Sequence, residues 1–184
     1  MDKELQMDDR SLWMMAQALP SRLRTLSTLL DKGAAFAEAK GLPFEALSQA
    51  QLAPDMFPLT RQVSIACRLS WEAVALLSGR ERPAMEPIGD GLEELKARID
   101  QTIGHLESVR EEEFRGASER RIVLPLQGEM TAEFSGPEFL RDWSLPNVYF
   151  HLATAYDILR HKGVELGKAD FMAHIGYALR GPAS

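Results

Sequence analysis

Apolar residues recur at helical spacing along four long segments of the chain. These segments cover approximately residues 20–40, 59–78, 92–112 and 145–162. In each of them an apolar side chain returns every three or four positions, and charged residues fill much of the remaining surface. This is the pattern of an amphipathic helix that packs one face against a core. The sequence therefore predicts four main helices.

Prolines and glycines mark where these helices begin and end. We expect a short helix over 11–19 before the first long one, with Pro20 as the break, because proline lacks a backbone N–H and disfavours helix in the preceding residue. Gly79 should end the second helix and Gly163 the fourth. The loop 80–91 between the second and third helices holds two prolines and two glycines.

The periodicity changes between the third and fourth helices. Two short runs rich in apolar residues, 122–126 and 130–134, flank a turn centred on Gly128, which is typical of a β-hairpin. Pro137 can open a helical turn that runs to about residue 142. A further short helix is expected in the tail, over 168–177.

Length and composition favour one domain. The chain has 184 residues, of which 45% are hydrophobic and 26% are charged, and a chain of this length can bury roughly 70% of its unfolded surface. The elements show no alternation of strand and helix that would predict a parallel sheet. We therefore expect a single, mainly all-α domain over 1–184: an up-and-down four-helix bundle with a small hairpin between its third and fourth helices.

The net charge, the hydropathy and the cysteine content limit the classes of binding partner and the cellular location that we expect. The formal net charge is −6 and the pI is ≈ 5.3, whereas binding to nucleic-acid phosphates needs clustered Lys and Arg, so no nucleic-acid partner is expected. The sequence has no apolar run close to the roughly 20 residues that span a bilayer, so no membrane partner is expected either. Cys67 is the single cysteine; it excludes an internal disulfide, favours a cytoplasmic location, and is expected to be a small buried residue.

Three polar residues fall where apolar ones belong. On a helical wheel, Asn147 and His151 lie near the centre of the inward arc of the fourth helix, which also includes Phe150, and Gln62 lies in the buried arc of the second. A buried amide or imidazole without a partner costs about 1–3 kcal/mol. These side chains should therefore bond to one another, to water, to an ion or to a ligand. Bundle cores build ligand and metal sites in this way, from facing helices.

The residues alone leave two interpretations of this arrangement open. A single inward histidine is more often a satisfied core residue than a ligand-binding one, so His151 fits either a closed hydrogen-bond network or a pocket. Asp55, in the turn before the second helix, can reach the mouth of such a pocket or can cap the helix. Tyr156 flanks the inward arc, where its phenol can donate to a ligand or lie at an interface. The other three histidines are expected at the surface.

The chain resembles a known family in several stretches. They include LAPDMFPL at 52–59, LPNVYFH at 145–151, and the shorter matches AY at 155–156 and ILR at 158–160. These residues are similar to those of an uncharacterised domain-of-unknown-function branch of the DinB/YfiT-like helical-bundle superfamily. The resemblance covers nearly the whole chain and implies a four-helix bundle that forms a homodimer. Better-known members of the superfamily hold a divalent metal with three histidines and include thiol-dependent transferases and isomerases.

This chain departs from the metal-binding members at the ligand positions. In those members one histidine comes from the second helix and two come from an H-x-x-x-H pair on the fourth; the matching positions here are Gln62, Asn147 and His151. Amide oxygens bind zinc or nickel more weakly than imidazole does. The resemblance therefore implies no resident cofactor beyond, at most, a weakly held divalent metal such as zinc or nickel.

Two functions follow from these residues. The first is a small-molecule-binding protein or dimeric interaction module without a tight metal, in which Gln62, Asn147 and His151 line a polar pocket, with Asp55 and Tyr156 at its edge. The alternative is a metal-assisted or thiol-dependent transferase or hydrolase. In that case His151 is the catalytic residue, and the two amides orient the substrate or a water molecule.

Overall fold

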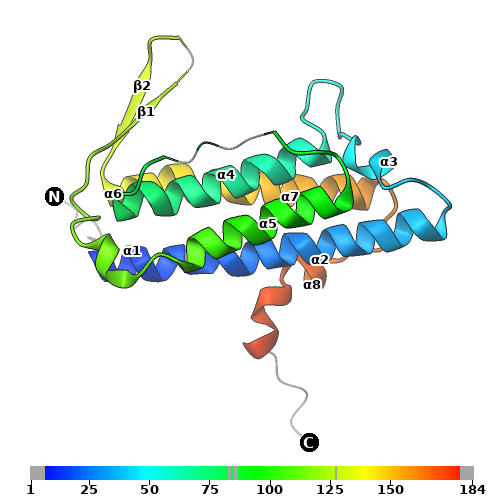
Figure 1. Cartoon of the computed structure of the whole chain (residues 1–184), viewed down its shortest axis with the longest axis horizontal. Helices are drawn as coiled ribbons and strands as arrows, with labels where there is room; N and C mark the ends of the chain where they lie inside the picture. The colour runs from blue at the N-terminus through cyan, green and yellow to red at the C-terminus, as the bar shows by residue number, and fades with distance from the viewer. Residues whose placement is uncertain (1–6, 83, 85–86, 127, 179–184) are drawn as a thin grey trace, which may run out of the picture.

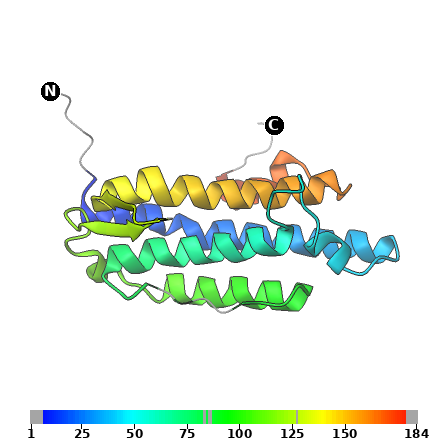
Figure 2. The same ribbon diagram turned by 90° about the horizontal axis from the view of Figure 1, so that it is seen from above.

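Four long helices lie side by side and form the body of the molecule (Figure 2). The computed structural model describes residues 7–82, 84, 87–126 and 128–178. The long helices are α2 (Ala18–Ala39), α4 (Leu59–Ser78), α5 (Leu92–Glu107) and α7 (Leu145–His161). They correspond to the four predicted helices, so the mainly helical class is confirmed. None of the described helices combines the length and the hydropathy of a membrane span.

Shorter elements connect and extend these helices. They are α1 (Asp9–Ala16), α3 (Glu45–Ser48), the 3-10 turn η1 (Glu111–Phe114), the strands β1 (Ile122–Pro125) and β2 (Thr131–Phe134), α6 (Gly136–Glu138), the π-helical segment η2 (Phe139–Ser144), α8 (Lys168–Phe171) and the 3-10 segment η3 (Ala173–Ala178). The short helix predicted over the tail is thus divided into α8 and η3.

The core lies between the four long helices. Their inward positions carry aliphatic side chains that are almost completely buried, including Leu23, Leu26 and Leu30 of α2, Val63, Ala66 and Ala73 of α4, Leu95 and Ile99 of α5, and Leu152, Ala155 and Leu159 of α7. Burial of one such leucine stabilises the fold by about 1.5–3 kcal/mol relative to leaving it in water.

The first helical break differs from the prediction. The chain turns at Gln17, between α1 and α2, and Pro20 lies inside the first turn of α2. A proline is tolerated there because the first backbone N–H groups of a helix have no partner inside it. Asp8 fixes the start of α1, since its Oδ1 accepts a 2.8 Å hydrogen bond from the backbone N–H of Ser11.

The helix predicted to run to residue 112 ends earlier, at Glu107, and the chain then turns into η1. No glycine or proline marks this end in the sequence. The predicted ends at Gly79 and Gly163 are correct: both glycines have positive φ, 76° and 94°. That backbone conformation favours glycine at the end of a helix.

The predicted turn at 137–142 and the fourth helix form one continuous helical run from Gly136 to His161. Ser135 and Glu138 form a capping box at its start. The run passes through the wider π turns of η2 just before Pro146. Such turns commonly occur where the regular backbone ladder is interrupted, and proline interrupts it because it has no N–H to donate.

The up-and-down order of the helices is not what the structure shows. In Figure 1 both α4 and α5 run from the α3 end of the molecule to the α1 end, and the loop between them returns along the molecule. Contacts between the helix ends agree: Arg80, just after α4, donates to Ser108, just after α5, at 3.0 Å. Lys96 near the start of α5 pairs with Asp31 near the end of α2. Hence α4 and α5 are parallel, while α4 and α7 are antiparallel.

The hairpin projects from one end of the helical body (Figure 1). Its strands pair antiparallel, from Ile122 opposite Phe134 to Pro125 opposite Thr131. Gly128, with φ 73°, lies in the turn as predicted. Ile122 and Leu124 are buried, which anchors one face of the first strand to the core.

A buried carboxylate fastens the returning loop to α4. The side chain of Glu72 is only 3% exposed, and its two oxygens contact Arg68 at 2.8 Å and Arg82 at 2.7 Å. Arg82 belongs to the returning loop, and Arg68 lies one turn before Glu72 on α4. A buried charge is tolerated when it is paired in this way.

We expect Arg82→Ala to destabilise the protein, because one oxygen of the buried Glu72 carboxylate loses its partner. The loss should be about 1–3 kcal/mol in the free energy of unfolding, measured by urea denaturation. The control is Arg24→Ala, which removes the exposed ion pair with Glu107 and should cost less than about 1 kcal/mol. Equal losses in the two variants would show that Arg82 does not hold the loop.

Candidate functional site

Gln62 of α4 and His151 of α7 meet across the interface of these two antiparallel helices. The Oε1 atom of Gln62 lies 2.7 Å from Nδ1 of His151. At its other end, Nε2 of Gln62 donates a 3.0 Å hydrogen bond to the backbone carbonyl of Phe57. Gln62 is 2% exposed, whereas His151 is half-buried. The structure thus brings together two of the three polar residues singled out in the sequence.

The partners of Gln62 determine which nitrogen of His151 carries a proton. The carbonyl of Phe57 can only accept, so the amide nitrogen of Gln62 must face it and the amide oxygen must face the imidazole. A neutral His151 therefore donates from Nδ1, and Nε2 keeps an unshared electron pair. In histidines generally, the hydrogen bond made by one ring nitrogen determines whether the other nitrogen carries a proton.

His151 is neutral near pH 7. Burial, and secondarily the positive charge of Arg68, lower the pKa of His151 from 6.5 to about 4. Both effects disfavour the protonated ring, since burial penalises a charge and a nearby cation repels it. At neutral pH the ring therefore offers a hydrogen-bond acceptor at Nε2.

Asn147 does not bond to this pair. Its Nδ2 donates a 2.7 Å hydrogen bond to the carbonyl of Trp143, one turn earlier in the same helical run. Trp143 belongs to the π segment η2. The amide thus serves the backbone beside that segment, a local role that the helical wheel could not reveal.

The hydrogen bonds of the pair include neither Asp55 nor Tyr156. Asp55 is exposed, and Pro58 occupies the N-cap position of α4, so the predicted cap by Asp55 is wrong. The ring of Tyr156 contacts that of Phe171 in α8, with 5.8 Å between the centroids. Five residues turn a helix by about 140° between His151 and Tyr156, which points the two side chains to different neighbours.

Two exposed aromatic rings flank the pair, and the sequence pattern did not indicate them. Phe150 was expected to face inward, yet it is 57% exposed, and its ring meets that of His151 edge-on at 5.2 Å. Phe57, whose carbonyl binds Gln62, is 53% exposed, and the guanidinium of Arg61 lies 5.6 Å from its ring centroid. The exposure of these two rings is seen only in the structure, because the helical wheel had placed Phe150 on the inward arc.

The donor set does not fit a tightly bound divalent metal. Oε1 of Gln62 already accepts from His151, and the amide of Asn147 is bonded to its own helix. One ring nitrogen, Nε2 of His151, is left, whereas zinc sites use three or four protein ligands. The positive charge of Arg68 also acts on this ring. Across the described ranges, no three His, Cys, Asp or Glu side chains gather as a metal-binding group.

The remaining cysteine and histidines lie elsewhere. Cys67 is completely buried, and burial raises the pKa of its thiol to about 12, so it is not a reactive thiolate. His161 and His105 are exposed as expected, and His105 stacks on Trp71 at 5.1 Å. His174, in η3 of the tail, is half-buried instead.

We expect NMR of the wild-type protein to find the proton of His151 on Nδ1 and none on Nε2. Gln62→Leu removes the acceptor that selects this tautomer, so the Nε2–H form should become populated. Long-range ¹H–¹⁵N correlation spectra distinguish the two forms. Gln49→Leu, at an exposed glutamine, is the control and should change nothing; an unchanged ring in Gln62→Leu would contradict the assigned hydrogen bond.

The pKa of His151 predicts a loss of stability in mild acid. The folded value, about 4, lies below the ordinary value of 6.5, so between these values the unfolded chain binds a proton that the folded protein refuses. Stability should therefore decrease as the pH falls from about 6.5 to 4. His151→Gln should show a smaller decrease in urea midpoint than the wild type, whereas His161→Gln should follow the wild type.

Comparison with known proteins agrees with this fold. Residues 14–172 match a family described as a domain of unknown function, DUF1993. The chain is also similar to the crystal structure of a DinB family member protein from Shewanella denitrificans, with 34% identity, a TM-score of 0.82, and coverage of 97% of this chain and 99% of that one. No curated protein matches the chain. The resemblance found in the sequence is thereby confirmed: the chain belongs to the DUF1993 family and, with it, to the DinB-like superfamily.

Proposed function

We propose that this DinB-like protein binds a small molecule at the surface formed by His151, Phe57 and Phe150, where the buried Gln62 orients the imidazole of His151. The ligand donates a hydrogen bond to Nε2 of His151 and places an apolar or aromatic group beside the two exposed rings. No tightly held metal takes part. We also propose that the long helices α2, α4, α5 and α7 act as one four-helix bundle domain that carries this surface.

The hydrogen-bond chain from Phe57 through Gln62 to His151 carries this proposal. A buried amide with both ends engaged holds the imidazole in one orientation and one tautomer. The half-buried ring then presents a fixed acceptor beside exposed apolar surface. A few well-placed polar groups within apolar surroundings are the usual composition of a small-molecule site.

The same geometry favours binding over acid–base catalysis. An imidazole with a pKa of about 4 accepts a hydrogen bond well at neutral pH but removes a proton poorly, because an effective general base has a pKa near the working pH. The buried thiol of Cys67 gives no support to a nucleophilic role. A thiol-dependent reaction would need a thiol from the substrate.

Phenol is a suitable probe, because it combines one hydroxyl donor with one aromatic ring. We expect it to bind the wild-type protein weakly, with its hydroxyl on Nε2 of His151, in an NMR titration. His151→Leu should weaken phenol binding at least fivefold, and His161→Leu, on the same helix but exposed, should not. Toluene, which has no donor, should bind both variants equally.

Three results would contradict this proposal. One is phenol binding that is the same in His151→Leu and in the wild type. Another is stoichiometric zinc or nickel in protein purified without a histidine tag, removable only by a chelator. A dimer that associates through Phe57 and Phe150 and binds no phenol would instead support the interaction-module function.

A further inference from the structure

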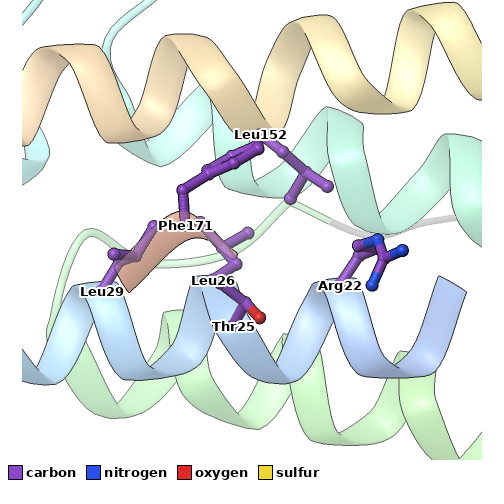
Figure 3. Close-up of a pocket in the computed structure, with 6 residues that line it drawn as sticks. All are labelled: Arg22, Thr25, Leu26, Leu29, Leu152 and Phe171. Atoms are coloured by element: carbon purple, nitrogen blue, oxygen red, sulfur yellow. The ribbon is translucent and has the colours of Figure 1, made fainter. Parts of the chain in front are cut away.

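Leu152, which lies about 100° from His151 around α7, borders a small crevice on a neighbouring face of this helix. The crevice lies between α2, α7 and α8 and has a volume of ≈ 10 Å³ (Figure 3). Figure 3 shows the ring of Phe171, from α8, lying between α2 and α7 beside Leu152. Six residues line the crevice: Arg22, Thr25, Leu26, Leu29, Leu152 and Phe171.

Phe171 forms one wall of the crevice, and its ring takes up space between α2 and α7 (Figure 3). Leu26, Leu29 and Leu152 are 1%, 1% and 3% exposed, so the half-buried ring of Phe171 shares the crevice with aliphatic side chains, and on another side it contacts the ring of Tyr156. An apolar space of about 150 Å³ lined in this way is known to accept benzene. Without Phe171, the same leucines would form a site for an aromatic or short aliphatic group.

Phe171 is held by a weakly attached segment. Neither α8 nor η3 contains a fully buried residue. Two kinds of contact attach α8 to the body: the ring of Phe171, which contacts Tyr156 and lies beside the leucines, and polar contacts near the surface, chiefly the ion pair of Asp170 with Lys32. An ion pair exposed to this extent contributes at most about 1 kcal/mol. Displacement of the segment is therefore inexpensive compared with opening the helical core.

Hydrogen-bond donors gather at one end of the crevice. Arg22 lies one turn before Leu26 on α2, and its Nε donates to the hydroxyl of Tyr149 at 3.0 Å. That hydroxyl accepts from Arg22, so its own O–H remains to donate. A guanidinium and a phenolic O–H side by side suit a carboxylate.

We propose that this crevice is a second ligand site, which takes a small monocarboxylate with an aromatic or short apolar body, and that Phe171 occupies it in the absence of ligand. The apolar body replaces the ring of Phe171 among the leucines, and the carboxylate binds Arg22 and Tyr149. One helical turn, about 5.4 Å, separates the two parts, which matches an arylalkanoate with two or three bonds between ring and carboxylate.

The test compares 3-phenylpropionate with its neutral analogue 3-phenylpropan-1-ol. Calorimetry or NMR titration should show that the acid binds Phe171→Ala at least tenfold more tightly than it binds the wild type, because the ring no longer competes. In Phe171→Ala the acid should also bind at least fivefold more tightly than the alcohol. Adding Arg22→Gln should abolish that preference, and adding the matched control Arg24→Gln, at an exposed arginine of the same helix, should preserve it.

A measurement on the wild-type protein covers the case in which Phe171→Ala fails to fold. If the acid displaces the ring of Phe171, amide hydrogen exchange over 168–172 should be faster in the presence of the acid and unchanged in the presence of the alcohol. Unchanged or slower exchange there would overturn the proposal. Equal binding of the acid and the alcohol to Phe171→Ala would also overturn the proposal. So would acid binding that is abolished by Phe57→Ala, because that result would place the acid at the exposed rings of the first site. His151→Leu should leave acid binding intact, which separates this site from the first.

Discussion

The amide of Gln62 has two different ends, and the candidate site depends on how the surrounding backbone uses them. The residue is 2% exposed, so each end needs a partner inside the protein. The chain supplies the carbonyl of Phe57 from the turn before α4 and the imidazole of His151 from α7. Since a carbonyl cannot donate, the amide has one orientation and the histidine has one neutral form. The side chain of Gln62 thereby connects the turn before α4 to α7 and determines which nitrogen of His151 carries the proton.

Much of the fold could be predicted because the spacing of apolar residues indicates helices and glycine indicates where a helix ends. The four long helices were found from their apolar stripes, and Gly79 and Gly163 mark two ends through their positive φ. The direction of α5 could not be predicted. A loop of residues 80–91 can span about 40 Å, whereas the 20 residues of α4 extend only about 30 Å. Such a loop permits either direction, and only contacts between helix ends distinguish them.

The candidate site was predictable to the extent that it follows the helical wheel. Gln62 and His151 point to each other because each lies on the arc that faces the other helix. Asn147 lies on the same arc, but its amide bonds instead to the carbonyl of Trp143, four residues earlier in the same helical run. Phe150 is exposed because it lies about 100° from His151 around the helix, at the edge of the packed surface. Contact with the tail, which directs Tyr156 to Phe171, has no local signal in the sequence.

The parallel arrangement of α4 and α5 has an electrostatic consequence. Two parallel neighbours place the partial negative charges of their C-terminal carbonyls at the same end of the molecule, where they repel each other. Two arginines lie at that end. Arg120 donates to the carbonyls of Leu76 and Leu77 in the last turn of α4, and Arg80 donates to the carbonyl of Ser108 beyond α5. At the end of the body nearest the hairpin, guanidinium groups therefore bind the carbonyls that terminate two parallel helices.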